Sequence, residues 1–219
     1  TLDGCLFIGN EVYNSNRGHG AGLAFVDCAS CDVNTTIISN NFIQSGGYQN
    51  GAGFYHATGV ARLRNCLIAG NWVAKAGYPG GLQIDSGTVT CESSTITDNP
   101  NIGIKNEKTG ASTLLNCIVW DNGINVTNLL GTFSASYCNI GDYAGAGSNG
   151  NLSQDPMFRA PEKGDYTLLS ASPSVDTGLA QAWMATSTDL AGNARLIGHL
   201  CDMGCYECTI RPGTTLFLR

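Results

Sequence analysis

The sequence is poor in charged residues and has no long apolar run. Charged residues make up 13% of the 219 positions, about half of the roughly 25% usual in soluble proteins. No segment approaches the roughly 20 consecutive apolar residues of a transmembrane helix, which argues against a membrane span. The net charge of −6 and the lack of a Lys/Arg cluster argue against nucleic acid as a partner. No signal peptide precedes Thr1, so we interpret the chain as a mature protein or an excised portion.

Helical periodicity and the common catalytic motifs are also missing. No ten-residue segment carries apolar side chains at the i, i+3, i+4 and i+7 positions of an amphipathic helix. No His-Glu-x-x-His, Gly-x-Ser-x-Gly or phosphate-binding loop is present. These absences favour an all-β protein and indicate no particular reaction.

Cysteine, in contrast, is abundant, with ten residues. A high and even count is typical of disulfide-bonded proteins in an oxidising, extracellular compartment, which is our first interpretation. Two alternatives stay open. The spacings Cys28-x-x-Cys31 and Cys201-x-x-x-Cys205-x-x-Cys208 resemble those of metal ligands, and free thiols can act as small buried apolar residues.

An internal repeat dominates the first 140 residues. In each unit a small residue is followed by an apolar residue two positions later and by Asn three positions after that. These segments are 5–10, 36–41, 66–71, 94–99 and 117–122, and residues 138–140 begin a sixth. A second, Gly-containing segment recurs at 20–25, 51–56, 79–84 and 101–106. Both segments alternate apolar with small or polar residues, which predicts short strands.

Repeats of this length predict a β-solenoid in which each unit forms one coil, with neighbouring coils about 4.8 Å apart. The expected inward columns are Phe7, Ile38, Ile68, Ile96, Val119 and Ile140, and Leu23, Phe54, Leu82 and Ile104. The recurring Asn is expected to adopt the left-handed turn conformation and to stack along the axis. A shared column position also predicts a Cys117–Cys138 disulfide, with Cys28–Cys31 as a second pair. A β-sandwich, the structural alternative, would not produce such regular columns.

Residues 1–140 resemble the right-handed parallel β-helix proteins of the pectate-lyase-like class. The remainder resembles the C-terminal cap of secreted bacterial β-helix proteins that carry a choice-of-anchor region. Its motifs are Asp155-Pro156-x-Phe158, Gly164-Asp165-Tyr166-x-Leu168, Ser172-Pro173-x-x-Asp176-x-Gly178, Asp189-x-x-Gly192-x-x-Arg195 and Asp202-Met203-Gly204-Cys205-Tyr206-Glu207. Cysteines at 201, 205 and 208 depart from this pattern and imply further cross-linking. The resemblance implies an exported bacterial protein and names no reaction.

We therefore expect an all-β, right-handed parallel β-helix over residues 1–140 and an irregular C-terminal cap over 141–219. The cap should cover the last coil, and residues 209–219 form either an added strand or a connection onward. Five charged cap residues are interpreted as a structural network of ion pairs and turns, since Asp beside Gly and Pro is typical of turns. They are Asp176, Asp189, Arg195, Asp202 and Glu207.

Two carboxylates form the first candidate site. Asp85 and Glu107 follow the second segment's Gly by the same four positions, so they should lie roughly 5 Å apart on adjacent coils. Such a pair shares a proton, binds a cation such as Ca²⁺ or holds a basic residue. The basic residues on the same or adjacent coils are Arg62, Arg64, Lys105 and Lys108, and Arg62 is the one assigned to the enzyme alternative. Acidic cation ligands with a basic residue resemble the sites of polysaccharide lyases of this class. No other metal site and no cofactor are predicted.

Aromatic residues form the second candidate site. Tyr48 and Tyr78 should lie near one another on long loops, beside Arg17, while Phe42 and Trp72 align one position after the turn Asn. Such a ladder can stack on sugar rings, or its rings can stack on each other to stiffen the loops.

The favoured function is a non-enzymatic extracellular or cell-surface stalk, adhesin or assembly subunit that binds polysaccharide. The alternative is a polysaccharide lyase or hydrolase that uses Asp85, Glu107 and Arg62. The expected partners are a polysaccharide, or further subunits that add to the open N-terminal coil, because a bare parallel edge invites another strand.

Overall fold

The computed structural model describes residues 1–14 and 16–210, so most of the strand or connection expected at 209–219 lies outside the described residues. Strands dominate the described part, which contains no α-helix and two short 3₁₀ helices, η1 (Pro161–Lys163) and η2 (Ala182–Thr186). None of the described helices is long and apolar enough to cross a membrane.

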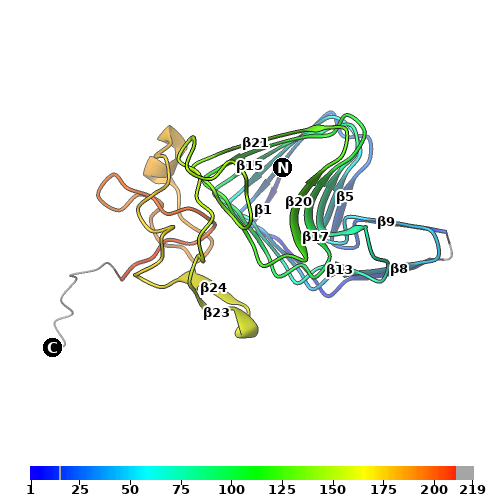
Figure 1. Cartoon of the computed structure of the whole chain (residues 1–219), viewed down its shortest axis with the longest axis horizontal. Helices are drawn as coiled ribbons and strands as arrows, with labels where there is room; N and C mark the ends of the chain where they lie inside the picture. The colour runs from blue at the N-terminus through cyan, green and yellow to red at the C-terminus, as the bar shows by residue number, and fades with distance from the viewer. Residues whose placement is uncertain (15, 211–219) are drawn as a thin grey trace.

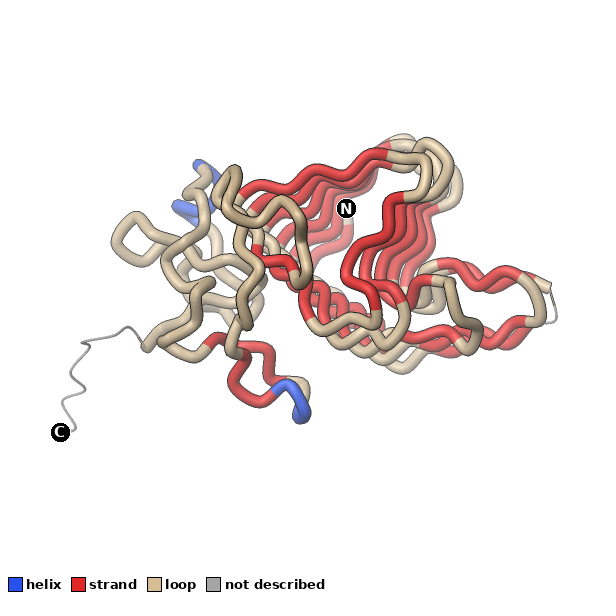
Figure 2. The backbone as a smooth tube through the Cα atoms, in the orientation of Figure 1, coloured by secondary structure: helices blue, strands red, loops and turns tan. Residues whose placement is uncertain are grey.

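The repeat builds a parallel β-helix with three main faces, seen end-on in Figures 1 and 2. Sheet 1 contains β1 (Leu2–Asp3), β6 (Ser30–Asn34), β11 (Val60–Arg64), β15 (Thr88–Glu92), β18 (Ala111–Leu115) and β21 (Thr132–Ser136). Sheet 2 contains β2 (Leu6–Ile8), β7 (Ile37–Ser39), β12 (Leu67–Ala69), β16 (Thr95–Thr97), β19 (Ile118–Trp120) and β22 (Asn139–Ile140). Sheet 3 contains β5 (Leu23–Phe25), β10 (Phe54–His56), β14 (Pro79–Ile84), β17 (Ile102–Asn106) and β20 (Ile124–Asn128).

The predicted inward columns are confirmed by the strand register. Along sheet 2, Phe7 pairs with Ile38, and the column continues in register through Ile68, Ile96, Val119 and Ile140. Along sheet 3, the column is Leu23, Phe54, Leu82 and Ile104. From the second coil onward these side chains are buried, which places the hydrophobic core inside the stack.

The recurring Asn residues form a hydrogen-bonded ladder. The side-chain oxygen of Asn71 accepts hydrogen bonds from the backbone and side-chain nitrogens of Asn41, at 3.0 and 2.8 Å, and the pattern repeats between coils. The full ladder is Asn10, Asn41, Asn71, Asn99 and Asn122. The conformational prediction was wrong by one residue, because the left-handed backbone occurs just before each ladder Asn. Those residues are Gly9, Asn40, Gly70, Asp98 and Asp121.

The predicted disulfides are absent, since all ten cysteines are free thiols. The Cys117 thiol donates to the carbonyl of Leu115, 3.4 Å away, and the Cys138 thiol donates to that of Ser136, 3.2 Å away. The hydroxyl of Ser94 makes the same bond to the carbonyl two residues before it. The thiols of Cys117 and Cys138 therefore take the place of the Ser94 hydroxyl in this turn and donate hydrogen bonds to backbone carbonyls.

A buried histidine interrupts the apolar interior. His56 occupies an inward position of β10, is fully buried, and neither ring nitrogen makes a well-formed hydrogen bond. Burial lowers the pKa of His56, and the backbone of Gly59 offsets this only in part. Because a buried imidazole resists protonation, the unfolded chain binds this proton more readily than the folded chain does.

We expect acid to destabilise the protein through His56. As the pH falls below about 6.5, this residue should remove up to about 1.4 kcal/mol of unfolding free energy per pH unit, until the folded-state pKa is reached. His56→Leu should flatten this slope, whereas His199→Gln, at an exposed position, should retain it. Denaturant titrations between pH 7.5 and about 5 measure both. Equal slopes in wild type and His56→Leu would contradict the assignment.

The cap lies mainly beside the coil stack (Figures 1 and 2). Residues 141–152 complete the last coil, where Asn151 accepts from the backbone of Cys138 and donates to that of Ala135. The following chain contains the hairpin of β23 (Phe158–Ala160) and β24 (Asp165–Leu168), and it packs Tyr166 and Cys205 against the outer face of sheet 2. The cap therefore covers the outer face of sheet 2 in addition to the last coil of the stack.

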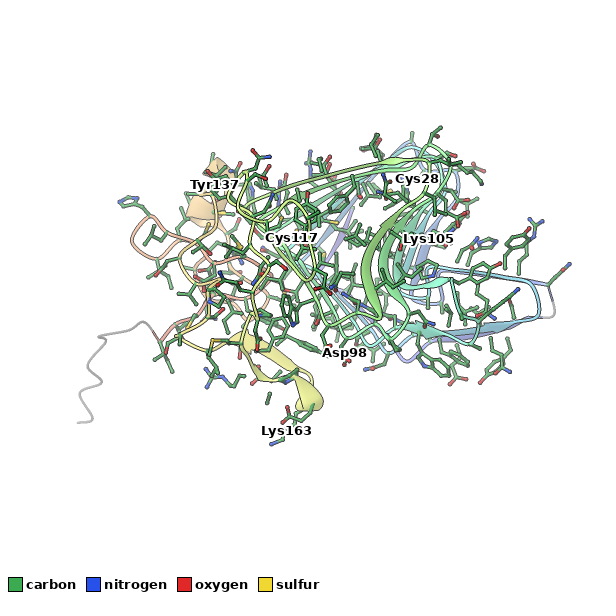
Figure 3. All side chains as sticks on the ribbon, viewed as in Figure 1. Cys28, Asp98, Lys105, Cys117, Tyr137 and Lys163 are labelled. Carbon is green, nitrogen blue, oxygen red and sulfur yellow. The ribbon has the colours of Figure 1, made fainter. Side chains whose placement is uncertain are left out.

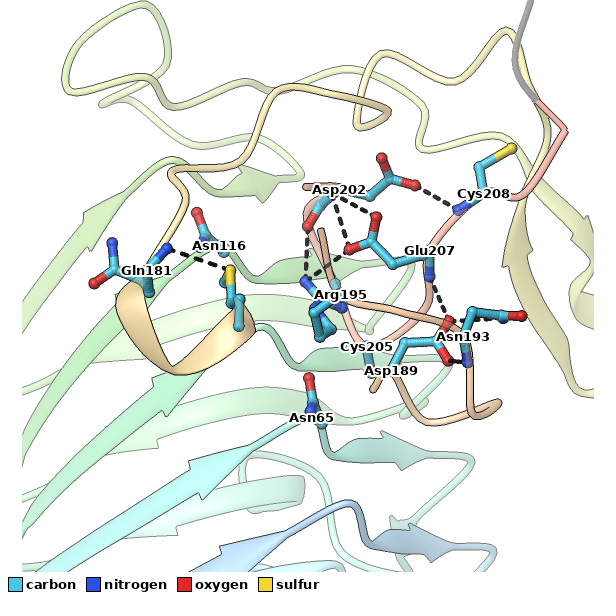
Figure 4. Close-up of polar contacts among 12 residues, drawn as sticks. Asn65, Asn116, Gln181, Asp189, Asn193, Arg195, Asp202, Cys205, Glu207 and Cys208 are labelled. Carbon is cyan, nitrogen blue, oxygen red and sulfur yellow. Dashed lines mark hydrogen bonds and ion pairs between the residues drawn. The ribbon is translucent and has the colours of Figure 1, made fainter. Parts of the chain in front are cut away.

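The predicted charged network of the cap is confirmed (Figure 4). Arg195 is fully buried and forms an ion pair with Glu207 at 3.1 Å. Its guanidinium also donates to the carbonyls of Gly204 and Asp202, both 3.0 Å away. The Asp202 and Asp189 carboxylates accept hydrogen bonds from backbone amides of neighbouring turns. These charges join the turns of a segment that has little regular structure.

Candidate functional site

A projecting arm distinguishes the first three coils from the rest (Figure 1). It consists of β3 (Glu11–Asn14), β8 (Phe42–Ser45) and β13 (Trp72–Val73) in one layer, β4 (Arg17–His19) and β9 (Tyr48–Asn50) in the other, and residues 74–78. Ile43 and Val73 pack between the layers. The layers meet so closely at Gly18 that an added Cβ would lie 2.3 Å from a methyl group of Ile43.

The buried side chain of Gln49 connects the second arm coil to the shortened third one. Its amide nitrogen donates to the Ser45 carbonyl at 2.7 Å, and its oxygen accepts from the backbone of Lys75 at 2.9 Å. The sequence thereby holds residues 75–78 against the arm, although they contain no strand before Pro79.

A pocket of about 620 Å³ lies where the arm meets the outer face of sheet 3. The arm lines it with Arg17, His19, Tyr48, Asn50, Gly77 and Tyr78. Sheet 3 and the turns that follow its strands line it with Tyr55, Asp85, Lys105, Glu107 and Lys108. Figure 3 shows Lys105 on the side of sheet 3 away from the coil interior. We call this the arm pocket.

The structure places Asp85 and Glu107 at the same position of adjacent coils, as the repeat predicts. Ile84 pairs with Asn106, and the Glu107 amide donates to the Ile84 carbonyl at 2.8 Å. Each carboxylate holds its own lysine. Asp85 pairs with Lys108 at 2.8 Å and Glu107 with Lys105 at 2.5 Å. The sequence left three arrangements open for this pair: a shared proton, a bound cation or basic partners. The structure contains the arrangement with basic partners.

Asp85 is held as an anion. Its burial would raise its pKa, but hydrogen bonds from Lys108, Gln83 and Tyr55 outweigh this effect and lower it. The Gln83 amide and the Tyr55 hydroxyl lie 2.8 and 3.1 Å from its two oxygens. A carboxylate with three donors is a poor proton donor near neutral pH, so its role is to position its neighbours.

The predicted grouping of Arg17, Tyr48 and Tyr78 is present. The two tyrosine rings meet edge to face with centroids 6.3 Å apart, and the Arg17 guanidinium lies 5.4 Å from the Tyr48 centroid. Tyr48 is exposed, whereas Tyr78 also packs against the interior of the arm. Lys105 approaches the Tyr78 ring at 5.5 Å and donates to the Gly77 carbonyl at 3.1 Å. Tyr78 is therefore a structural part of the wall.

Phe42 and Trp72 lie outside the arm pocket. They belong to the other arm layer, in register with each other, and their side chains do not line the pocket. Their rings stack face to face with centroids 3.7 Å apart, and the Tyr13 ring meets Phe42 edge-on at 6.0 Å. Phe42 is buried as a result. Ring stacking thus stiffens the arm, the second of the two uses considered for this ladder.

Arg62 is separated from the carboxylate pair. It lies on β11 of sheet 1, where its guanidinium is 3.8 Å from Asp32 and half exposed. Sheet 1 and sheet 3 are different faces of the stack, so Arg62 and the Asp85–Glu107 pair do not form one site.

Sequence reasoning missed the floor of the pocket. The His19 ring packs against the Tyr55 ring with centroids 4.7 Å apart. Its Nδ1 lies 3.0 Å from the side-chain amide nitrogen of Asn50. Burial lowers the pKa of His19, which keeps the ring neutral at pH 7. The strand register could have revealed this contact from the sequence. When Arg17 pairs with Tyr48 on the neighbouring coil, His19 pairs with Asn50.

Comparisons of the chain with protein-family models, with curated protein sequences and with solved structures found no match. Within residues 1–14 and 16–210, no group of three or more His, Cys, Asp or Glu side chains is arranged to hold a metal ion. The arm pocket is therefore the feature of the structure that points most directly to a function.

Proposed function

We propose that the protein is a non-enzymatic, extracellular β-helix module, such as a surface stalk, adhesin or assembly subunit, that binds a polysaccharide in the arm pocket. The observation that carries the proposal is the exposed Tyr48 ring beside a floor of polar and charged groups. An aromatic ring offers an apolar face to the C–H side of a sugar. The oxygens of amides and carboxylates accept hydrogen bonds that the sugar hydroxyls donate.

The size and composition of the arm pocket support this proposal. Its volume of about 620 Å³ falls in the range of about 300–1,000 Å³ typical of small-ligand sites. The Asn50 amide and the Asp85 carboxylate are among the polar groups that line the pocket. The pocket spans several coils, whose spacing of about 4.8 Å is close to the length of one sugar unit.

Binding is favoured over catalysis by the state of the carboxylates. Hydrolysis by a carboxyl pair needs one group that can donate a proton and one that cannot. Lysines accompany both Asp85 and Glu107, and the pKa of Asp85 is lowered. Arg62, the basic residue of the enzyme alternative, lies on another face.

Two further parts of the proposal concern location and assembly. The resemblance of the cap motifs to those of exported β-helix proteins supports an extracellular or cell-surface location. The terminal positions of β1, β2 and β5 in their sheets support stacking of further subunits on the first coil.

Tyr48→Ala tests the binding site. We expect this variant to weaken retention on a panel of immobilised oligosaccharides by about tenfold, or about 1.4 kcal/mol, because it removes the stacking surface. Its unfolding free energy should change by less than about 1 kcal/mol, since the ring is exposed.

Tyr13→Ala is the matched control for this experiment. Tyr13 is an exposed tyrosine of the same arm, on the layer opposite the pocket. The Tyr13→Ala variant should retain glycans as well as wild type does. Wild-type protein that retains no glycan of the panel, or equal losses in both variants, would overturn the proposal.

A further inference from the structure

The charges of the arm pocket are almost balanced internally. Three positive and two negative side chains line it, with His19 neutral, so the net charge of the lining is +1. Lys105 and Lys108 are each paired with a carboxylate. Lys105 is also buried and donates to the Gly77 carbonyl, so its ammonium group already has two partners.

Arg17 accounts for the remaining charge. Among the described residues no carboxylate lies within ion-pair distance of its guanidinium, whose nearest aromatic contact is the Tyr48 ring. Arg17 is exposed at the first coil, at the opposite end of the pocket from Lys105. Burial lowers the pKa of His19, and the charge of Arg17 acts in the same direction, so the guanidinium also influences the pocket floor.

We propose that the arm pocket selects a glycan that carries one singly charged acidic group, a carboxylate or a sulfate ester, and that this group is bound by Arg17. This inference rests on the proposed glycan-binding function. The planar guanidinium donates two parallel hydrogen bonds to such an oxyanion. The neighbouring neutral sugar then stacks on Tyr48, which is in register with Arg17.

The pocket disfavours a polyanion for the same reason. A second acidic sugar farther along the pocket meets Asp85 and Glu107, whose lysines are already occupied. It gains attraction only by displacing one of these carboxylates, which then loses its ion-pair partner. One acidic group at the Arg17 end, followed by neutral sugars, fits the charge distribution better than an acid on every sugar.

The test uses matched ligands on the full chain. One neutral oligosaccharide is compared by calorimetry with the same oligosaccharide carrying a single terminal carboxylate, with its carboxyl-reduced form, and with a singly sulfated form. Wild type should bind the carboxylated or the sulfated ligand at least about tenfold more tightly than the neutral ones, and a polyuronate of equal length no more tightly. The sulfated and carboxylated arms identify which oxyanion Arg17 prefers.

Arg17→Gln should abolish this preference, so that the variant binds acidic and neutral ligands with equal affinity. Arg159→Gln, an exposed cation of the cap hairpin paired with Asp165, should retain the preference. Equal binding of acidic and neutral ligands by wild type, or a preference that survives in Arg17→Gln, would overturn the inference and leave glycan binding intact. Absence of binding to every ligand would overturn both.

Discussion

Arg195→Met is expected to lower the unfolding free energy of the cap by about 3–5 kcal/mol, the usual cost of removing one partner of a buried ion pair. Glu207 would keep a charge in a site from which solvent is excluded, since both side chains are fully buried. The carbonyls of Gly204 and Asp202 would also lose their donors. Denaturant unfolding followed by tryptophan fluorescence, to which Trp183 of the cap contributes, measures the loss.

Two further variants separate charge from packing. Arg195→Met with Glu207→Gln removes both charges and retains an oxygen that accepts from the Asp202 amide, so it should recover much of the lost free energy. Arg159→Met breaks an exposed pair and should cost less than about 1 kcal/mol. A loss of less than about 1 kcal/mol in Arg195→Met would contradict the structural role of this ion pair.

Asn71→Ala is expected to cost a similar amount, about 3–5 kcal/mol, by breaking the Asn ladder at its centre. The side chain of Asn71 makes four hydrogen bonds, two from Asn41, one to the Ile38 carbonyl and one to Asn99. All of these groups are buried, so the backbone amide of Asn41 would be left without an acceptor.

Asn10→Ala provides the matched control at the end of the same ladder. Asn10 is exposed on the first coil, and its side chain makes one bond, to Asn41. Its loss should cost less than about 1 kcal/mol. Equal denaturation midpoints for Asn71→Ala and wild type would show that the ladder contributes nothing. Hydrogen exchange at the Asn41 amide gives a local measurement of the same effect.

The repeat pattern predicts the coil stack and part of the candidate site. Residues that recur at the same position of each coil must lie above one another when parallel strands pair. Ile68 and Ile96 therefore share a buried column, and Asp85 and Glu107 are neighbours in the arm pocket. The same reasoning brought Tyr48 and Tyr78 together beside Arg17. The cap network around Arg195 was also predicted from its residues, although not its buried position.

The repeat pattern does not predict which columns of different faces meet, because this depends on how the arm packs against the coil stack. The arm folds back so that its layer with Tyr48 faces sheet 3 and its layer with Trp72 faces away, a choice that depends on one-residue alternation within short strands. The stacking of Cys117 on Cys138 likewise did not predict correctly whether they form a disulfide. Their thiols point toward backbone carbonyls. Repetition specifies neighbours along the axis, whereas the arm pocket and the free thiols depend on side-chain direction.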